Sequence, residues 1–110
     1  MDMVKIHQYE VFLISLDPLL GSEVQKTLPC VVVSPDEMNE FSKTLIVIPI
    51  TSKVMSYPWR VPCLIDNRSA SMATDQIKVV DRASIALKIG KLSKGEIIVL
   101  KDALHKMLID

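Results

Sequence analysis

Polar residues that could carry chemistry stand at the ends of two apolar stretches of this sequence. The segment GSEVQKTLPCVVVSP opens with a polar loop, which carries Ser22 and Glu23, and runs into a β-branched stretch. The segment IPITSK ends in Thr51, Ser52 and Lys53. A carboxylate can move a proton, a hydroxyl can hydrogen-bond an oxyanion, and a lysine can supply positive charge. If the two apolar stretches form neighbouring strands, these groups line one polar pocket where the strands end.

Length and composition indicate a folded chain of one domain, residues 1–110, with a modest core. Hydrophobic residues make up 49% of the sequence and charged residues 24%, which excludes a disordered tail. The formal net charge of 0 excludes a basic field over the whole chain, so a nucleic-acid site would have to be a local cluster. No apolar run approaches the roughly 20 residues that cross a bilayer. With no signal-peptide pattern at the start, we expect a cytoplasmic location and no contact with a membrane.

The two cysteines, Cys30 and Cys63, each lie inside an apolar, strand-like run. There is no CxxC pair and no Cys/His cluster, so we expect both to be buried, reduced thiols. A zinc site built from these cysteines with His7 and His105 would fit no known ligand spacing. We therefore expect neither a metal nor another cofactor.

The element pattern is a series of short strands followed by a terminal helix. Strands are predicted over residues 11–16, 29–34, 44–51, 60–65, 71–74, 76–80 and 87–92. Pro49 and Pro62 fall inside two of them and indicate an edge or a bulge at these points. A short helix that ends near Phe41 is predicted to begin with Ser34 as N-cap and Pro35 at its first position.

One long helix closes the chain. Ser93 and Glu96 have the spacing of a capping box, which predicts where this helix begins. An apolar stripe then recurs at helical spacing, through Ile97, Leu100, Leu104, Met107 and Leu108. The pattern as a whole predicts a mainly-β or α+β domain, a small and strongly curved barrel with helices packed on it.

In their order and spacing, several segments together resemble one known family, the MazF/PemK toxin endoribonucleases or mRNA interferases. These segments are EVFLISLDPLLGSEVQKTLPCVVVSPDEMN, VIPITSK, YPWRVP, DQIKVVDR and KIGKLS, which reach from Glu10 to the C-terminal helix. The resemblance implies an SH3-like barrel of the PemK/CcdB type and a homodimer. It also implies the toxin of a toxin–antitoxin system, which cleaves single-stranded RNA without a metal or the ribosome and whose cognate antitoxin blocks the site.

The resemblance also suggests roles for individual residues. Thr51 stands where the family has the threonine that ends the third strand, and Glu23 is a candidate proton acceptor or base-reading group. Asp75 and Gln76 match the family's Asp-Gln pair. RNA contacts are expected from Ser22, Ser52, Lys53, Arg60, Asp75, Gln76 and Lys78, with Lys88 as a further member of the basic cluster.

One departure from the family pattern concerns catalysis directly. Where the family has Lys-Thr-Arg-Pro, this chain has Lys26-Thr27-Leu28-Pro29, so that Leu28 occupies the position of the catalytic arginine. A guanidinium is always charged and its fork matches two phosphoryl oxygens, and leucine offers neither property. We expect Leu28 to expose an apolar side chain beside the polar pocket and to reduce or abolish cleavage.

Several alternatives stay open at this point. Leu28 could be an inactivating substitution that lets cells tolerate the protein, or the mark of a naturally degenerate member kept for binding. A gyrase-directed toxin on the same barrel would place function in the C-terminal helix, and a non-catalytic SH3-like module would only bind peptide or RNA. Trp59 is more typical of a packing residue, although an aromatic ring beside Arg60 and Lys53 can stack on a base.

Overall fold

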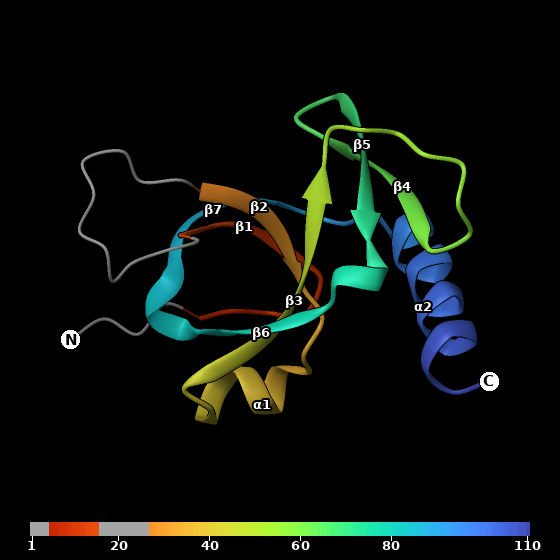
Figure 1. Ribbon diagram of the computed structural model, residues 1–110. Coiled ribbons are helices and arrows are strands. Elements are labelled where there is room, and N and C mark those ends of the chain that lie inside the picture. The colour runs from red at the N-terminus through yellow and green to blue at the C-terminus, as the bar shows by residue number, and fades with distance from the viewer. Residues whose placement is uncertain (1–4, 16–26) are drawn as a thin grey trace.

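Antiparallel strands make up most of the described chain, residues 5–15 and 27–110 of the computed structural model (Figure 1). Within these residues the strands are β1 (Glu10–Ser15), β2 (Thr27–Val32), β3 (Thr44–Thr51), β4 (Arg60–Ile65), β5 (Arg68–Ala73), β6 (Lys78–Asp81) and β7 (Ile85–Lys91). The helices are α1 (Asp36–Phe41) and α2 (Lys94–Leu108), with 3₁₀ turns η1 (Thr74–Gln76) and η2 (Arg82–Ser84). The predicted mainly-β fold with a C-terminal helix is confirmed.

The strands pair in the order β4-β5-β3-β2-β1-β7, and β6 pairs with β3 as well. β3 is the strand that joins the two parts of this sheet. Its residues 44–47 pair with β6, residues 47–49 pair with β2, and Ile50 and Thr51 pair with β5. Figure 1 shows the result: β1, β2, β6 and β7 curl to one side, while the β4–β5 hairpin stands beside α2.

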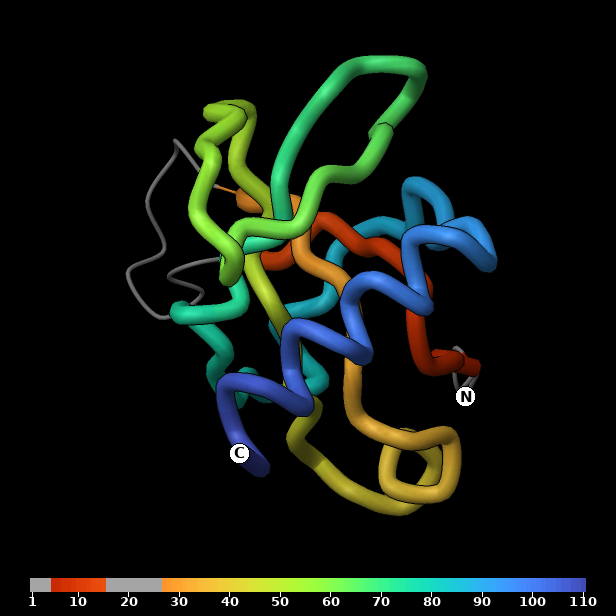
Figure 2. Tube along the Cα trace, turned by 90° about the vertical axis from the view of Figure 1, so that its right-hand side faces the viewer, coloured from red at the N-terminus to blue at the C-terminus, as the bar shows by residue number. Residues whose placement is uncertain are grey.

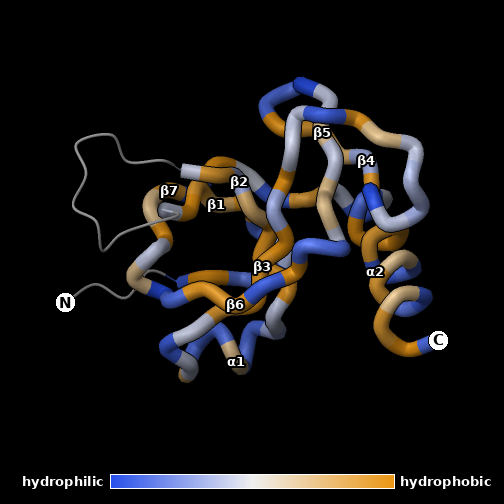
Figure 3. Tube along the Cα trace, in the orientation of Figure 1, coloured by the Kyte–Doolittle hydropathy of each residue, from blue (hydrophilic) through white to orange (hydrophobic). Residues whose placement is uncertain are grey.

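Two hydrophobic cores share the central strands. The helix-side core consists of Val11, Val31, Ile48, Ile50, Val61, Cys63, Ala70, Met72, Leu92 and Leu100. The curl core lies among β1, β2, β3, β6 and β7 and consists of Ile6, Phe12, Ile14, Cys30, Val32, Leu45 and Val47, with Leu28, Val80 and Ile85 packed against it. Successive residues of one strand point to opposite faces, so each central strand contributes to both cores. This explains why these strands are apolar without alternation, as the hydropathy colouring of Figure 3 shows.

The capping box predicted for the long helix is present. Ser93 Oγ accepts a hydrogen bond from the Glu96 backbone N–H at 3.1 Å, and Glu96 Oε1 accepts one from the Ser93 N–H at 2.8 Å. The second carboxylate oxygen of Glu96 accepts from the Leu64 N–H at 2.7 Å, which fastens the start of α2 to β4. No helix in the described part of the chain is long and apolar enough to span a membrane.

The apolar stripe of α2 packs only along its first turns. Leu100 is fully buried, and Ile97 and Leu104 pack against the helix-side core. Leu108, which the sequence pattern placed on the same face, is 58% exposed. The helix runs obliquely across the strands (Figure 2), and its last turn extends beyond β4 (Figure 1).

Ser34 is not the N-cap of α1, so that prediction is wrong. Pro35 occupies the N-cap position and makes no side-chain capping hydrogen bond. The buried Ser34 hydroxyl instead donates to Asn39 Oδ1 and accepts from the Ile46 N–H at 3.1 Å. This hydroxyl therefore joins α1 to β3, a role that depends on a contact between distant parts of the sequence.

The two prolines within strands have different settings. Pro62 lies on β4, which pairs only with β5 among the described strands, so the predicted edge position is confirmed. Pro49 lies inside β3 and pairs with Cys30 of β2, so it is not on an edge strand. It falls where the other side of β3 changes its partner from β6 to β5, and a residue without an N–H is tolerated at such a break.

Both cysteines are buried free thiols, as expected. Cys30 belongs to the curl core and Cys63 to the helix-side core. Burial raises the pKa of each thiol to about 11. Each side chain is thus both sheltered from solvent and held in the unreactive protonated form.

The native protein should accordingly resist a bulky thiol reagent at pH 8, because neither thiol is accessible or ionised. Both thiols should react fully once urea unfolds the chain. Mass spectrometry of the labelled protein, with and without urea, measures the two states. Rapid labelling of the native protein would contradict the burial of these residues.

Candidate functional site

Strand pairing and side-chain hydrogen bonds hold the polar end of β3 and the residues that follow it. Thr51 pairs with Ser71 of β5, and its Oγ1 accepts from the Lys53 N–H at 3.2 Å. The Ser71 hydroxyl donates to the Lys53 carbonyl at 2.5 Å, which anchors the turn that follows the strand. Ser52 and Lys53 are exposed, and Thr51 is half-buried. This strand end thus presents hydroxyl and ammonium groups to solvent from a hydrogen-bonded backbone.

Arg60 and Asp75 form a bidentate ion pair close to this strand end. Arg60 Nε lies 2.9 Å from Asp75 Oδ1, and its Nη2 lies 3.2 Å from Oδ2. The hydrogen bonds from the Arg60 guanidinium hold the pKa of Asp75 below its usual value. The structure therefore brings these two predicted residues together, and the arginine charge is neutralised by the carboxylate.

Gln76 and Lys78 lie in the next stretch of chain. Gln76 is exposed at the end of η1, and Lys78 begins β6 opposite Val47 of β3. Burial raises the pKa of Cys30, and the positive charge of Lys78 opposes that rise. Asp75 and Gln76 thus form a 3₁₀ turn before β6 and not part of a strand.

Leu28 lies on β2 opposite Ile14 of β1, where its half-buried side chain packs against the curl core. The expectation of an exposed leucine is therefore wrong, because the interior of the curl accepts this side chain. β2 and β3 pair as far as Cys30 and Pro49, so Leu28 and Thr51 lie at the same end of the two strands. Beyond that point Leu28 is next to β1, whereas Thr51 is next to β5. Two predicted site residues, Ser22 and Glu23, lie outside the described residues.

Lys88 does not join the predicted basic cluster. It lies on β7, with β1 and β2 between it and β3. Its Nζ is 2.6 Å from Oε2 of the buried Glu10. Burial raises the pKa of Glu10, but hydrogen bonds from Lys88 and the His7 N–H outweigh this and lower it overall. Lys88 therefore serves as the partner of a buried carboxylate.

An aromatic pair in the loop between β3 and β4 received too little weight in the sequence interpretation. The rings of Tyr57 and Trp59 stack with their centroids 5.0 Å apart and an angle of 8° between their planes. They are 47% and 41% exposed, so they are not core residues. The signal in the sequence was the i, i+2 spacing of two aromatics around Pro58, close to Lys53 and Arg60.

The described residues bring together no group of three or more His, Cys, Asp or Glu side chains that could hold a metal ion. What they do provide is a set of hydroxyls, cations and flat rings on the segment 51–60 and the adjoining turn η1. Such groups suit hydrogen bonding to phosphate oxygens and stacking on bases.

Solved structures share the curled sheet with its C-terminal helix. The chain superposes on a MazF crystal structure from Deinococcus radiodurans with a TM-score of 0.78 at 19% identity, covering 96% of this chain and 98% of the other. For an endoribonuclease in complex with its cognate antitoxin, from a mycobacterial species, the TM-score is 0.77 at 15% identity, covering 96% and 95%. These similarities establish the fold.

Sequence comparison then identifies the family. The model of the PemK-like, MazF-like toxins of type II toxin–antitoxin systems matches residues 7–108, and the chain belongs to this family. It is 31% identical to the endoribonuclease MazF9 of Mycobacterium tuberculosis over 107 residues, which covers 86% of this chain and 89% of the relative. Identity to an endoribonuclease toxin MazF of Escherichia coli is 28% over 96 residues, with 86% of each chain covered.

The Arg60–Asp75 ion pair makes stability depend on pH in a defined direction. Asp75→Asn should lower the free energy of unfolding at pH 7 by about 1 kcal/mol, an amount reduced from that of a buried pair because the carboxylate is 38% exposed. The pKa of Asp75 is lower in the folded protein than in the unfolded chain, so the ion pair contributes its full stabilisation at pH values above the unfolded-state pKa near 3.9. This contribution is lost as the pH falls through the folded-state pKa of Asp75. Urea unfolding at pH 7 and at pH 2 measures the free energy of unfolding with and without this contribution.

Asp102→Asn is the matched control, since Asp102 forms an exposed i, i+4 pair with Lys106. Its effect at pH 7 should be smaller. If the deficit of Asp75→Asn persisted unchanged at pH 2, the ion pair would not be its cause.

Proposed function

We propose that this toxin acts on single-stranded RNA through the polar strand end at Thr51, as a cytoplasmic endoribonuclease weakened by Leu28. The observation that carries the proposal is the conjunction of family membership over residues 7–108 with an uncharged side chain at position 28. The relatives named above are endoribonucleases, and their activity is extended to this chain as part of the proposal.

In the proposed reaction a 2′-hydroxyl attacks the adjacent phosphate, the bond between phosphorus and the 5′-oxygen of the next nucleotide breaks, and that oxygen takes up a proton and leaves as a 5′-hydroxyl. The reaction needs the phosphate held in place, the proton of the 2′-hydroxyl removed, and the charge on the phosphoryl oxygens stabilised. In our proposal, Thr51 hydrogen-bonds a phosphoryl oxygen and Glu23 accepts the proton. The attacking oxygen belongs to the RNA, so the products carry a 2′,3′-cyclic phosphate or 3′-phosphate and a 5′-hydroxyl.

Charge stabilisation is the part of the reaction that Leu28 weakens. Leu28 packs against the curl core and cannot neutralise a phosphoryl oxygen. Arg60, a cation close to the strand end, is already paired with Asp75. We propose that Ser22, Ser52, Lys53, Gln76 and Lys78 contact the RNA, while the Arg60–Asp75 pair orients the surrounding turns. We therefore expect Leu28 to weaken the binding of RNA less than its cleavage.

Leu28→Arg should raise the rate of RNA cleavage by roughly 10²–10³, because it restores one charged donor aimed at the transition state. The variant should also arrest growth when expressed. Cleavage of an end-labelled RNA in the presence of a chelator measures the rate, and circular dichroism checks the fold.

Two controls separate charge from packing in this experiment. Leu28→Met fills a similar volume without charge and should leave the rate unchanged, whereas Thr51→Ala added to Leu28→Arg should abolish the gain. Equal cleavage rates for the original chain and Leu28→Arg, with both folded, would show that position 28 is not the electrostatic centre of the site.

We further propose two protein partners, a cognate antitoxin and a second copy of the chain. Solved MazF relatives include MazE–MazF complexes from Deinococcus radiodurans, which supports an antitoxin for this toxin. An acidic, disordered antitoxin segment would suit the cations Lys53 and Lys78. α2 and its C-cap residue expose Ile98, Leu108 and Ile109 at 68%, 58% and 72%, which supports a further protein contact.

The homodimer can be measured directly. Sedimentation equilibrium at micromolar concentration should give twice the mass of the 12.3 kDa chain. Ile98→Lys, which puts a charge on the outward side of α2, should shift the equilibrium toward the monomer. A mass of one chain at every concentration would reject the dimer.

A binding-only role is the second candidate function, and Leu28 is the observation that favours it. Such a protein would bind RNA and antitoxin but would not cut RNA even as Leu28→Arg. Retained binding with no cleavage in that variant would favour this role over the first.

A further inference from the structure

The stacked pair Tyr57–Trp59 is fixed by its backbone while its rings remain exposed. The Tyr57 carbonyl accepts from the Arg60 N–H at 2.9 Å, and the Trp59 carbonyl accepts from both the N–H and the hydroxyl of Thr74. Nearly parallel rings in such a loop form a rigid flat surface, and rigidity lowers the entropy lost when a ligand binds.

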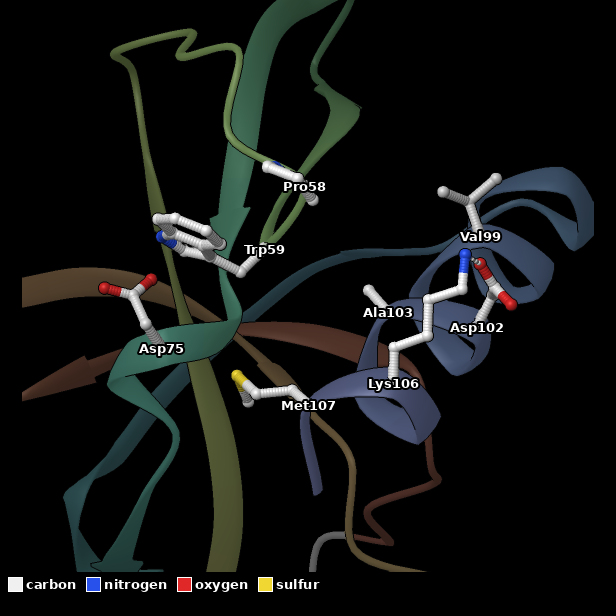
Figure 4. A pocket seen from close by; sticks show the side chains of 8 residues that line it. All are labelled: Pro58, Trp59, Asp75, Val99, Asp102, Ala103, Lys106 and Met107. Carbon is white, nitrogen blue, oxygen red and sulfur yellow. Dashed lines mark ion pairs between the residues drawn. The ribbon is translucent and has the colours of Figure 1, made fainter. Parts of the chain in front are cut away.

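A hollow of about 390 Å³ lies between Trp59 and helix α2. Its lining residues are Pro58, Trp59, Asp75, Val99, Asp102, Ala103, Lys106 and Met107. Figure 4 shows Trp59 and Asp75 on one side of the hollow and the α2 side chains on the other. Its volume is within the usual range of small-ligand sites, about 300–1,000 Å³.

The charges around the hollow are largely compensated. Asp75 is paired with Arg60, and Asp102 Oδ2 lies 3.1 Å from Lys106 Nζ. What remains between these pairs is apolar, with an indole on one wall and Val99, Ala103 and Met107 on the other. A flat, uncharged ring is the kind of group that such a space accepts.

We propose that this hollow receives one nucleobase of the bound single-stranded RNA, stacked against Trp59. The inference rests on the proposed function, because it assumes that RNA binds at the end of β3. Trp59 belongs to the loop that follows Thr51 and begins with Ser52 and Lys53. The phosphate backbone would cross the exposed ammonium of Lys53, and a neighbouring base would enter the hollow. Stacking on an aromatic ring accepts any base, so this contact adds affinity with little sequence preference.

The chain contains one tryptophan, so its fluorescence reports on Trp59 alone. The probe is a short 2′-O-methyl RNA, which cannot be cleaved because it has no free 2′-hydroxyl. Its binding should quench the emission, whereas an oligonucleotide of the same length with abasic sites has the same phosphates and should quench far less. Anisotropy of an end-labelled copy measures RNA binding independently of the tryptophan.

Variants give a second and independent readout. Trp59→Ala should weaken binding roughly ten- to hundredfold, and Trp59→Phe should retain most of the affinity because a ring is still present. Phe41→Ala is the matched control, since Phe41 is 79% exposed on α1 and far from this loop in the sequence. It should leave the affinity unchanged.

The possible results separate this inference from the proposed function. RNA binding without quenching, together with normal affinity of Trp59→Ala, would overturn the base site and leave the RNA function standing. No anisotropy change at all would overturn both. Emission that shifts with protein concentration in the absence of RNA would show that a second copy covers the indole, which also overturns the proposal.

Discussion

Burial of the central strands on both faces is the constraint on which the rest of this structure depends. Along β1, β2 and β3, neighbouring residues such as Val11 and Phe12, or Cys30 and Val31, enter different cores. No side of these strands is left for polar side chains along their middle stretches. Groups that meet a ligand are therefore confined to the strand ends and to the loops between them.

β3 places its polar end where the sheet changes direction. It crosses from the curl to the β4–β5 hairpin at Pro49, and its polar end at Thr51 emerges on the hairpin side. Leu28, at the same end of β2, stays with the curl and adds its side chain to that core. In our proposal, Leu28 replaces the charge of a catalytic arginine with hydrophobic packing. Such a replacement favours the stability of the fold and weakens the stabilisation of the transition state.

Local sequence signals predicted the parts of the fold that local physics determines. The Ser93 and Glu96 capping box needs only residues of its own helix turn, and Pro62 marks an edge because it has no N–H to donate. The full apolar runs correctly indicated strands buried on both faces. These signals, together with the resemblance of the segments, were sufficient for the fold class.

The failures concern contacts between distant segments. The Ser34 hydroxyl bonds to Ile46 of β3, and Lys88 pairs with Glu10 across β1 and β7, and neither partner can be read from neighbouring residues. The stacking of Tyr57 on Trp59 depends on how the loop is fixed by Thr74. The sequence allowed us to predict which kinds of side chain lie at the strand ends. The three-dimensional structure was needed to show which of their charges are already paired.

The central claim is that RNA binds where β3 ends and the loop to β4 begins. Amide hydrogen exchange of the original chain, with and without a single-stranded RNA, tests it without relying on catalysis. The account predicts slower exchange in residues 52–59 and 74–78 on addition of RNA, and no change in α1. Protection that appears on α1 and β7 while residues 52–59 and 74–78 are unaffected would contradict it.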